Sequence, residues 1–441
     1  MTIKRRFKLT SAQVIIFGFA GVIILATLLL MLPISSADKS FTPFLNAAFT
    51  ATSATCVTGL VVYDTATHWS AFGQAIILTL IQIGGMGVVT VAICFSKLSG
   101  KKVGLLGRSF MQDSIAAPRL GGIMKFTRFV VLTALIIEFT GALLLMPAFC
   151  KNFGVKGIWF SFFHSISAFC NAGFDIMGEK GQFSSLTFFN SNIAVNVIIM
   201  LLIIIGGIGF ATWHDIKDHG FKIRRYSLQS KAILILTAVF IIVPALFFFF
   251  AEFGGMAPKD RTLASLFQSV TLRTAGFNTV DFSGIGGASL AVMIVFMLIG
   301  GAPGSTAGGM KVTTVAVLLF STLSVFSRRK TVRMGNRNID DENVKVAAAV
   351  LMMYITLFFA GAVAISLSDG LPLHMCLFET ASAIGTVGLT TGITAGLSAF
   401  SKTVIILLMY IGRVGGLTVI FAAAKTSITG AKLPLEKITV G

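Results

Sequence analysis

Long runs of apolar residues dominate this chain, and polar residues gather in the shorter stretches between them. Runs long enough for a membrane-spanning helix occupy residues 11–33, 72–95, 129–149, 192–212, 232–251, 346–367 and 403–424. A helix needs about 20 apolar residues to cross the hydrocarbon core of a bilayer. A further apolar segment, 287–322, is longer than this and is interrupted by glycines, so we expect a broken helix there. The pattern predicts an all-α polytopic membrane protein with eight spans.

Four shorter apolar segments, each of about 12 residues, lie between the paired long runs and are too short to cross a bilayer. Each ends at a glycine turn, centred on Gly59, Gly173, Gly276 or Gly388, at intervals of 114, 103 and 112 residues. Each segment must therefore enter and leave the membrane on the same side. The repetition predicts four similar units arranged as walls around one axis, over residues 1–100, 101–222, 223–330 and 331–441.

The four glycine turns share a backbone pattern but not their side chains. They read Val57-Thr58-Gly59, Asn171-Ala172-Gly173, Thr274-Ala275-Gly276 and Thr386-Val387-Gly388. Glycine adopts positive φ without steric cost, which allows successive carbonyls to point one way. Rings of carbonyl oxygens select potassium in channels, whose TVGYG loop begins with the same three residues as the fourth turn. We therefore predict that the main chain of the four turns binds potassium.

Two other interpretations of the turns are weaker. A single glycine in a membrane helix most often marks a site of close packing. Four glycines in register after four short helices instead favour a shared aqueous axis, because non-helical backbone at that depth must line water or be packed in protein. No acidic residue occupies the turn positions, which argues against a calcium or magnesium site built from carboxylates.

The distribution of charge adds an orientation. Charged residues make up only 12% of the 441 residues, against about 25% in soluble domains, yet the net charge is +18. The basic residues cluster at the termini and between units, as expected of cytoplasmic loops, so we predict cytoplasmic termini and no nucleic-acid partner. The first apolar run is too long for a cleaved signal and is expected to be retained. Five dispersed cysteines without a CxxC pair indicate neither disulfides nor a zinc site.

The break in the third unit is the candidate gate. It comprises Gly300, Gly301, Ala302, Pro303, Gly304, Ser305, Thr306, Ala307, Gly308, Gly309 and Lys311. Five glycines and a proline cannot form a stable helical interior, which favours a flexible segment below the turns. A phosphate-binding loop would need a preceding strand and a differently placed lysine. An intramembrane protease using Ser305 would need a histidine on a neighbouring span, whereas His164 and His374 fall in the short segments.

Ionisable residues at membrane depth are functional candidates. Alignment of the units places Arg413 in the same region as the broken segment. A positive charge there would repel an ion in the pore and shorten its stay, or would interact with the carbonyls of the loop. A structural salt bridge is an equal alternative for Arg413. Glu379 precedes Gly388 by nine residues and is expected to brace the fourth turn rather than bind ions. Glu138 and Arg273 are expected to be packing partners.

With these turns and this break, the chain from about residue 10 onward resembles the Ktr/Trk/HKT superfamily of potassium transporters, and most closely the bacterial Ktr-type membrane subunit. The resemblance implies four M1–P–M2 repeats, with eight transmembrane helices and four re-entrant pore helices in pseudo-fourfold symmetry around a central pore. It implies a loop that obstructs the path below the filter, an arginine near it on the last span, and, through Gly59, selectivity for potassium. The implied partners are membrane lipid, a second copy of the chain and a cytosolic ring of nucleotide-binding subunits, at a bacterial cytoplasmic membrane.

Two classes of function fit these features. The first is a channel-like translocator that takes up potassium through a gated filter, and the second is an alternating-access symporter that couples potassium to sodium. Inverted repeats favour symporters, whereas these four units share one orientation, which favours a pore. Potassium is the expected substrate, and sodium stays open as a second one. No covalent cofactor and no enzymatic activity are expected.

Overall fold

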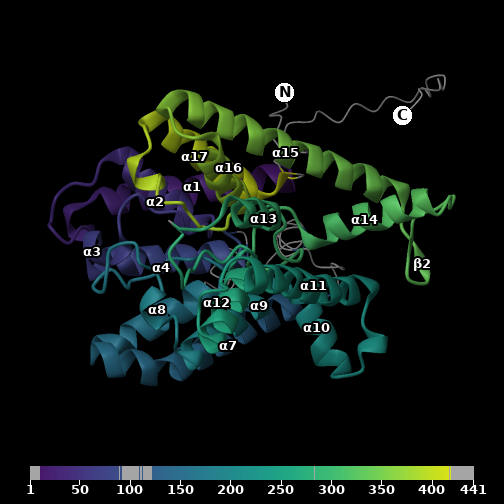
Figure 1. Cartoon of the computed structure of the whole chain (residues 1–441), viewed down its shortest axis with the longest axis horizontal. Coiled ribbons are helices and arrows are strands. Elements are labelled where there is room, and N and C mark those ends of the chain that lie inside the picture. The colour runs from purple at the N-terminus through teal and green to yellow at the C-terminus, as the bar shows by residue number, and fades with distance from the viewer. Residues whose placement is uncertain are drawn as a thin grey trace, which may run out of the picture.

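The structure is a computed structural model built almost wholly of α-helices (Figure 1). It describes residues 10–88, 90–91, 109, 112, 122–282, 284–416 and 418. The first helices are α1 (Ser11–Met31), α2 (Phe44–Thr55), α3 (Thr65–His68), α4 (Ala71–Met86), α7 (Ile123–Phe153), α8 (Lys156–Phe169), α9 (Ile193–Gly207) and α10 (Phe210–His219). The later helices are α11 (Leu228–Ala251), α12 (Pro258–Thr271), α13 (Gly287–Met297), α14 (Val312–Phe326), α15 (Asp341–Asp369), α16 (Leu373–Gly385) and α17 (Ala399–Val414). The remaining elements are η1 (Pro33–Ser35), η2 (Thr187–Phe189), η3 (Ile223–Arg225), η4 (Thr394–Gly396) and a hairpin of β1 (Arg333–Met334) and β2 (Arg337–Asn338).

Four helices, α1, α7, α11 and α15, are long and apolar enough to cross a membrane, with 21, 31, 24 and 29 residues. Each presents large apolar side chains on its outer face. Examples that are more than half exposed are Leu25, Ile136, Leu246 and Phe359. Water-soluble proteins rarely expose such continuous apolar faces, whereas lipid covers them. The chain is therefore a multi-pass helical membrane protein, as its hydrophobic pattern predicts.

Three runs expected to form straight spans are broken, namely 72–95, 192–212 and 403–424. Helices α4 and α17 end immediately before Gly87 and Gly415, and both glycines have positive φ. Helix α9 gives way at Gly209, also with positive φ, to α10, and the two axes differ by 96°. Positive φ cannot continue a right-handed helix, so each of these glycines ends one. The last residues of the first and third runs lie outside the described residues. The break predicted within 287–322 is confirmed, because α13 and α14 flank non-helical backbone.

A short helix follows each long one and packs against it. These helices are α2, α8, α12 and α16, with 12, 14, 14 and 13 residues, and they confirm the four short helices predicted from the sequence. Pro43 and Pro372 stand at the N-cap and Pro258 in the first turn, where the missing N–H costs nothing. Helix α17 contacts α2, α4 contacts α8, α9 contacts α12 and α13 contacts α16. The four units thus close into a ring in chain order.

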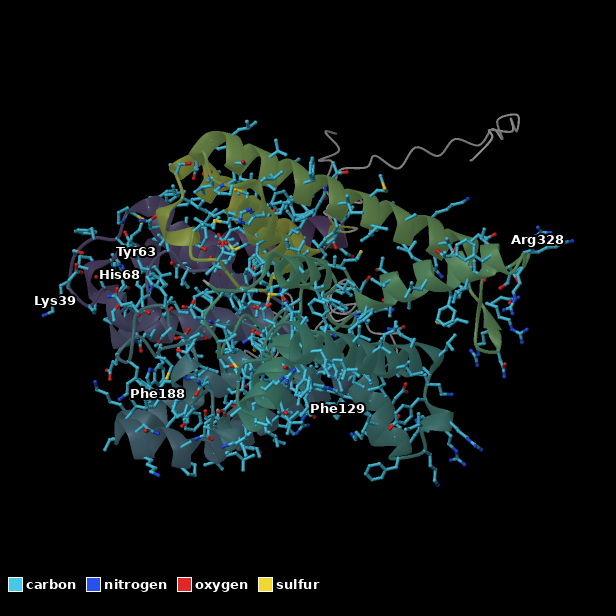
Figure 2. The ribbon with its side chains drawn as sticks, in the orientation of Figure 1. Lys39, Tyr63, His68, Phe129, Phe188 and Arg328 are labelled. Atoms are coloured by element: carbon cyan, nitrogen blue, oxygen red, sulfur yellow. The ribbon has the colours of Figure 1, made fainter. Side chains whose placement is uncertain are left out.

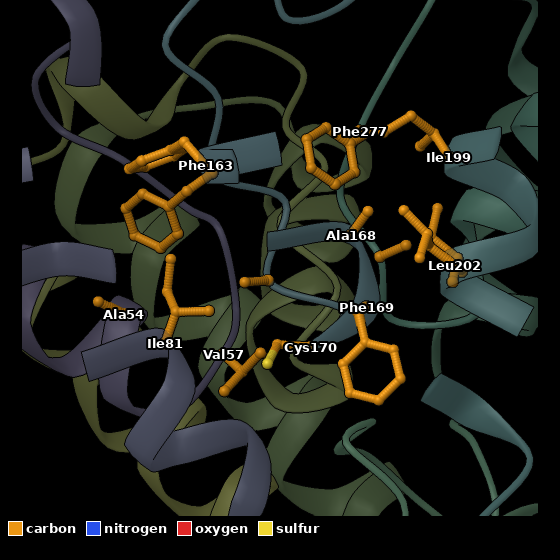
Figure 3. Packing of buried hydrophobic residues seen from close by; sticks show 14 of the residues in the cluster. Ala54, Val57, Ile81, Phe163, Ala168, Phe169, Cys170, Ile199, Leu202 and Phe277 are labelled. Carbon is orange, nitrogen blue, oxygen red and sulfur yellow. The ribbon is translucent and has the colours of Figure 1, made fainter. Parts of the chain in front are cut away.

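The core of the protein lies where the short helices end. Figure 3 shows Val57, Ile81, Phe169, Cys170 and Leu202 among the buried apolar side chains packed between α2, α4, α8 and α9. The described cysteines form no disulfide. Close packing of this kind holds non-helical backbone in one conformation, and the non-helical backbone here is the set of glycine turns.

Candidate ion-conducting site

The C-terminal ends of the four short helices run directly into the glycine turns. The turn glycines have positive φ: Gly59 (96°), Gly173 (67°), Gly276 (80°) and Gly388 (92°). The residue two places earlier is left-handed as well, although none of the four is glycine: Val57 (56°), Asn171 (58°), Thr274 (62°) and Thr386 (51°). This conformation costs a residue with a Cβ about 1–2 kcal/mol. Sequence patterns predict positive φ only at the glycines, and the repeated strain at the other four residues shows that the surroundings hold the backbone in place.

The four turns meet one another in a ring, which we call the glycine ring (residues 57–59, 171–173, 274–276 and 386–388). A Cβ added to any of its glycines would come within 3.0 Å of a carbonyl oxygen of the next unit. The pairs are Gly59 with Ala172, Gly173 with Ala275, Gly276 with Val387, and Gly388 with Thr58. The contacts close in chain order. The structure therefore brings together all the turn residues singled out in the sequence.

The main-chain carbonyls of the glycine ring stand apart in their hydrogen bonding. Among the described residues, no hydrogen bond is accepted by a main-chain oxygen of the ring. All of the ring residues are buried. Buried carbonyls in proteins are nearly always paired. A cluster of them without donors, and without a carboxylate among its side chains, is typical of a surface that coordinates a monovalent cation.

A serine six residues before the glycine supports three of the turns. The carbonyls of Ser53, Ser167 and Ser382 each accept a 2.8 Å hydrogen bond from the residue preceding the glycine. The Ser53 and Ser382 hydroxyls accept from the amides of Gly59 and Gly388 at 3.1 and 3.0 Å. These serines are not among the site residues predicted from the sequence, although their constant spacing before the glycine is visible in it.

The third turn is supported differently. Thr271 lies five residues before Gly276, and its carbonyl accepts from the Ala275 amide at 3.0 Å. Its hydroxyl donates to the carbonyl of Phe277, as the Ser167 hydroxyl does to Phe174 at 2.7 Å. The support is therefore similar, but its register is shifted by one residue.

The 300–311 loop joins α13 to α14 and is tied to the helices around it. Its own ends are paired, since the Gly300 amide donates to Met310 at 2.7 Å and the Val312 amide donates to Gly301 at 3.0 Å. The Ala302 amide donates to the carbonyl of Gly207 at 2.9 Å, at the break between α9 and α10. The loop is thus an ordered segment packed against the second unit.

The same loop reaches the glycine ring and the fourth unit. A Cβ on Gly308 would clash with the side chain of Thr386 in the ring. The Gly309 amide donates to the carbonyl of Gly412 on α17 at 3.3 Å. A loop in this place can obstruct a path that leaves the ring.

Two cationic side chains donate hydrogen bonds to backbone carbonyls in and beside the 300–311 loop. The Arg413 guanidinium donates to the carbonyls of Thr306 and Gly84, and to that of Gly85 at 3.3 Å. The Lys311 ammonium donates to the Ala307 carbonyl at 2.7 Å. Ion pairs among the described residues involve neither cation, so the salt bridge considered for Arg413 is not observed there. A cavity of about 330 Å³ is lined by both cations and the loop.

The remaining charged residues at this depth have separate roles. Glu138 accepts two hydrogen bonds from the Gln82 amide at 3.0 Å, which fits a packing partner. Glu379 is fully buried and accepts from the hydroxyls of Thr390 and Thr394, which follow the fourth turn. This is the geometry expected of a brace behind that turn.

Arg273 and Ser305 are the remaining polar groups considered from the sequence. Arg273 is buried, and two of its guanidinium nitrogens have no hydrogen-bond partner among the described residues, so no packing partner for its charge is seen there. Ser305 donates to the carbonyl of Ala302. His164 is bonded to the carbonyl of Phe160 instead of to Ser305. This geometry does not support the protease interpretation.

Comparison with known proteins places this geometry in a family. Residues 3–430 match the model of the TrkH family, described as cation transport proteins. The chain is 36% identical to the potassium/sodium uptake protein NtpJ of Enterococcus hirae, over 99% of this chain and 98% of that protein. It is 37% identical to the Ktr system potassium uptake protein B of Bacillus subtilis, over 98% and 97% of the two chains.

A solved structure has the same fold. The crystal structure of the potassium transporter TrkH from Vibrio parahaemolyticus matches with a TM-score of 0.76, over 97% of this chain and 87% of that one, at 19% sequence identity. The family is one of transporters, not of enzymes, and its model covers nearly the whole chain. The chain belongs to the TrkH family of cation transport proteins.

Proposed function

We propose that this protein takes up potassium across a bacterial cytoplasmic membrane and that the glycine ring is its selectivity filter. The observation that carries the proposal is the closed ring of buried carbonyls that accept no hydrogen bond from the described part of the chain. Such oxygens replace the hydration shell of a weakly held monovalent cation. The names of the relatives from Bacillus subtilis and Enterococcus hirae, both called uptake proteins for potassium, support the same substrate.

The proposed layout is four M1–P–M2 repeats. Helices α1, α7, α11 and α15 are the M1 helices, and the short helices α2, α8, α12 and α16 are the re-entrant pore helices. The second helix is interrupted at Gly87, Gly209 and Gly415 in the first, second and fourth repeats, and by the 300–311 loop in the third. Counting each interrupted helix as one span gives eight transmembrane helices in pseudo-fourfold symmetry. Figure 2 supports one polarity, because Arg328 lies at one end of the molecule and Lys39, Tyr63 and His68 at the other. We assign the Arg328 end to the cytoplasm and propose cytoplasmic termini on the basis of the basic residues near both ends of the sequence.

The 300–311 loop acts as the gate in this proposal. Its contact with Thr386 in the ring and its bonds to α9 and α17 support a closed position. Arg413 and Lys311 would hold the loop in this position by donating hydrogen bonds to its carbonyls. Deleting part of residues 302–308 is expected to raise ion flux. Lower flux at a normal membrane level of the protein would contradict a gating role.

We propose two protein partners. The chain forms a homodimer in the membrane, and a cytosolic ring of nucleotide-binding subunits regulates it. The exposed basic side chains of Arg328, Arg329, Lys330, Arg333 and Arg337 surround the β1–β2 hairpin and support a contact surface for that ring. Exposed apolar side chains on the M1 helices contact membrane lipid.

Sodium coupling is the second candidate function. It is favoured by the name of the Enterococcus hirae relative, a potassium/sodium uptake protein. A sodium-coupled symporter would require sodium outside the cell for potassium uptake, whereas a gated pore would not. Measuring uptake with external sodium replaced by choline separates the two.

The test of the proposed function is uptake in cells that lack their own potassium uptake systems. The wild-type chain, expressed with a Ktr-type nucleotide-binding subunit, is expected to restore growth at low potassium and to take up ⁸⁶Rb⁺. Failure to do either, with the protein present in the membrane and the subunit supplied, would refute the assignment.

A further inference from the structure

One side chain of the glycine ring connects the ring to the 300–311 loop. The Asn171 amide donates to the carbonyl of Arg273 at 3.1 Å, directly before the third turn. The Asn171 amide oxygen accepts from the hydroxyl of Thr306 in the loop at 3.0 Å. The same hydroxyl lies 3.0 Å from the carbonyl of Phe169, which precedes the second turn. Asn171 and Thr306 are both fully or almost fully buried.

The equivalent residues of the other three turns make no such hydrogen-bonded connection within the described part of the chain, although Thr386 packs against Gly308 of the loop. Val57 has no polar side-chain atom. The hydroxyls of Thr274 and Thr386 are buried and have no hydrogen-bond partner in the described part of the chain. Asn171 is therefore the member of this set whose side chain links two turns and the loop. Asparagine also tolerates the left-handed conformation better than most residues.

Thr306 is itself fixed on two sides. Its carbonyl accepts from Arg413 and its amide donates to the carbonyl of Gly206 at 3.2 Å. A movement of the loop that clears a path must break these bonds together with the bond to Asn171. In a buried site, the amide oxygen of Asn171 would then lose its partner, which is costly. The position of the loop and the arrangement of the second and third turns are therefore coupled.

We propose that Asn171 is a positioning residue that couples the state of the 300–311 loop to ion selection in the glycine ring. With the loop closed, the Thr306–Asn171–Arg273 connection holds the second and third turns in register. When the loop moves away, these turns are released and discrimination between potassium and sodium decreases. The inference rests on the proposed function of the ring as a filter and of the loop as a gate.

Two substitutions test the coupling. Thr306→Val keeps the shape of the side chain and removes the donor. Asn171→Thr introduces the residue type that the third and fourth turns already carry at this position. It removes the side-chain amide that hydrogen-bonds both the Arg273 carbonyl and the Thr306 hydroxyl. Each is expected to reduce the preference for potassium over sodium by about threefold to tenfold, the range of one net buried hydrogen bond. Because both break one connection, the double variant should lose no more than the stronger single variant.

Ion flux requires an open loop, in which the connection to Asn171 is already broken, so the preference must be measured with the loop closed. The measurement is therefore binding of ⁸⁶Rb⁺ to the purified full-length chain without a regulatory partner, in competition with potassium or sodium, and flux is measured separately as ⁸⁶Rb⁺ uptake into cells lacking potassium uptake systems. Thr237→Val serves as the matched control, since its buried hydroxyl on α11 has no hydrogen-bond partner among the described residues, and it should leave the preference unchanged. If the Asn171→Thr variant does not reach the membrane, the ion preference of the Thr306→Val variant is sufficient to test the coupling.

The outcomes are distinct. Reduced preference in Thr306→Val, a residue outside the ring, supports the coupling. An unchanged preference with altered flux would mean that Thr306 acts on the gate alone, and additive losses in the double variant would mean two independent effects, so either overturns the inference. Absence of ⁸⁶Rb⁺ uptake by the wild type would instead refute the proposed function.

Discussion

The glycine ring and the 300–311 loop are both glycine-rich, non-helical backbone within the membrane protein, but their carbonyls are used differently. In the ring, no protein donor reaches the main-chain oxygens of the described turns. In the loop, Arg413 and Lys311 donate to the carbonyls of Thr306 and Ala307. The carbonyl oxygens of the ring are therefore free to coordinate a mobile cation. Those of Thr306 and Ala307 in the loop already accept hydrogen bonds from cationic side chains. The two segments are alike in composition and differ in the donors around them, and this difference underlies the proposed roles of filter and gate.

The two regions also differ in how they are built. Each turn of the ring comes from a different unit and is supported within its own unit by a serine or threonine five or six residues earlier. The loop comes from the third unit alone; its ends are paired within that unit, and its middle is bonded to the second and fourth units. The position of the loop therefore depends on three units, whereas the main support of each turn lies within its own unit.

Gly388→Ala gives the largest expected loss and tests the rigidity of the ring. The new Cβ would meet the Thr58 carbonyl within 3.0 Å at a φ of 92°, so we expect ⁸⁶Rb⁺ uptake to fall by about tenfold or more. Gly392→Ala is the matched control, because Gly392 has a φ of 94° but no atom within 4 Å of its added Cβ. Equal losses in the two variants would show that strain alone matters and that the turns need not approach one another.

Arg413→Gln tests the statement that cations of the protein hold the loop. Loss of the charge-assisted hydrogen bonds to Thr306 and Gly84 should loosen the loop and raise uptake by roughly threefold to tenfold. The control is Lys402→Gln, which removes a cation that contacts Asn46 instead of the loop. Reduced uptake at a normal protein level would assign Arg413 to structure and would remove the contrast between the two regions.

Ser382→Ala sharpens the comparison with a smaller effect. The Gly388 amide would lose its hydroxyl acceptor, and we expect the preference for potassium over sodium to fall by about twofold to fivefold. Thr380→Val is the control on the same helix, because its hydroxyl bonds to the Cys376 carbonyl within α16 and supports no turn. If both variants keep the wild-type preference, the hydroxyl does not support the filter.

The sequence predicts the general arrangement well because its signals are local. Apolar runs identify the long helices, and Pro43 and Pro372 mark the starts of two short ones. Gly59 and its three counterparts identify the turns because positive φ leaves few alternatives to glycine. The breaks at Gly87, Gly209 and Gly415 were missed since apolar residues continue on both sides of each glycine.

Other features depend on tertiary contacts and had no local signal. Left-handed backbone at Val57 and Thr386 contradicts the preference of β-branched residues and exists because the neighbouring turns impose it. The connection from Asn171 to Thr306 joins residues 135 apart in the chain. The serine six residues before three of the glycines is visible in the sequence. Its role becomes clear only from the structure, because the amides of Gly59 and Gly388 lie beyond the end of a helix and donate to the serine hydroxyl instead of to a helical carbonyl.

The most direct test of the central claim compares inhibition of ⁸⁶Rb⁺ uptake by potassium and by sodium in the wild type and in Gly59→Ser. A side chain at Gly59 would meet the Ala172 carbonyl at a φ of 96°, whereas Gly392→Ser adds the same side chain in open space. The account predicts that potassium inhibits far more strongly than sodium in the wild type and in Gly392→Ser, and that this difference is largely lost in Gly59→Ser. Equal inhibition by the two ions in the wild type, or an unchanged ratio in Gly59→Ser, would contradict a filter made by the glycine ring.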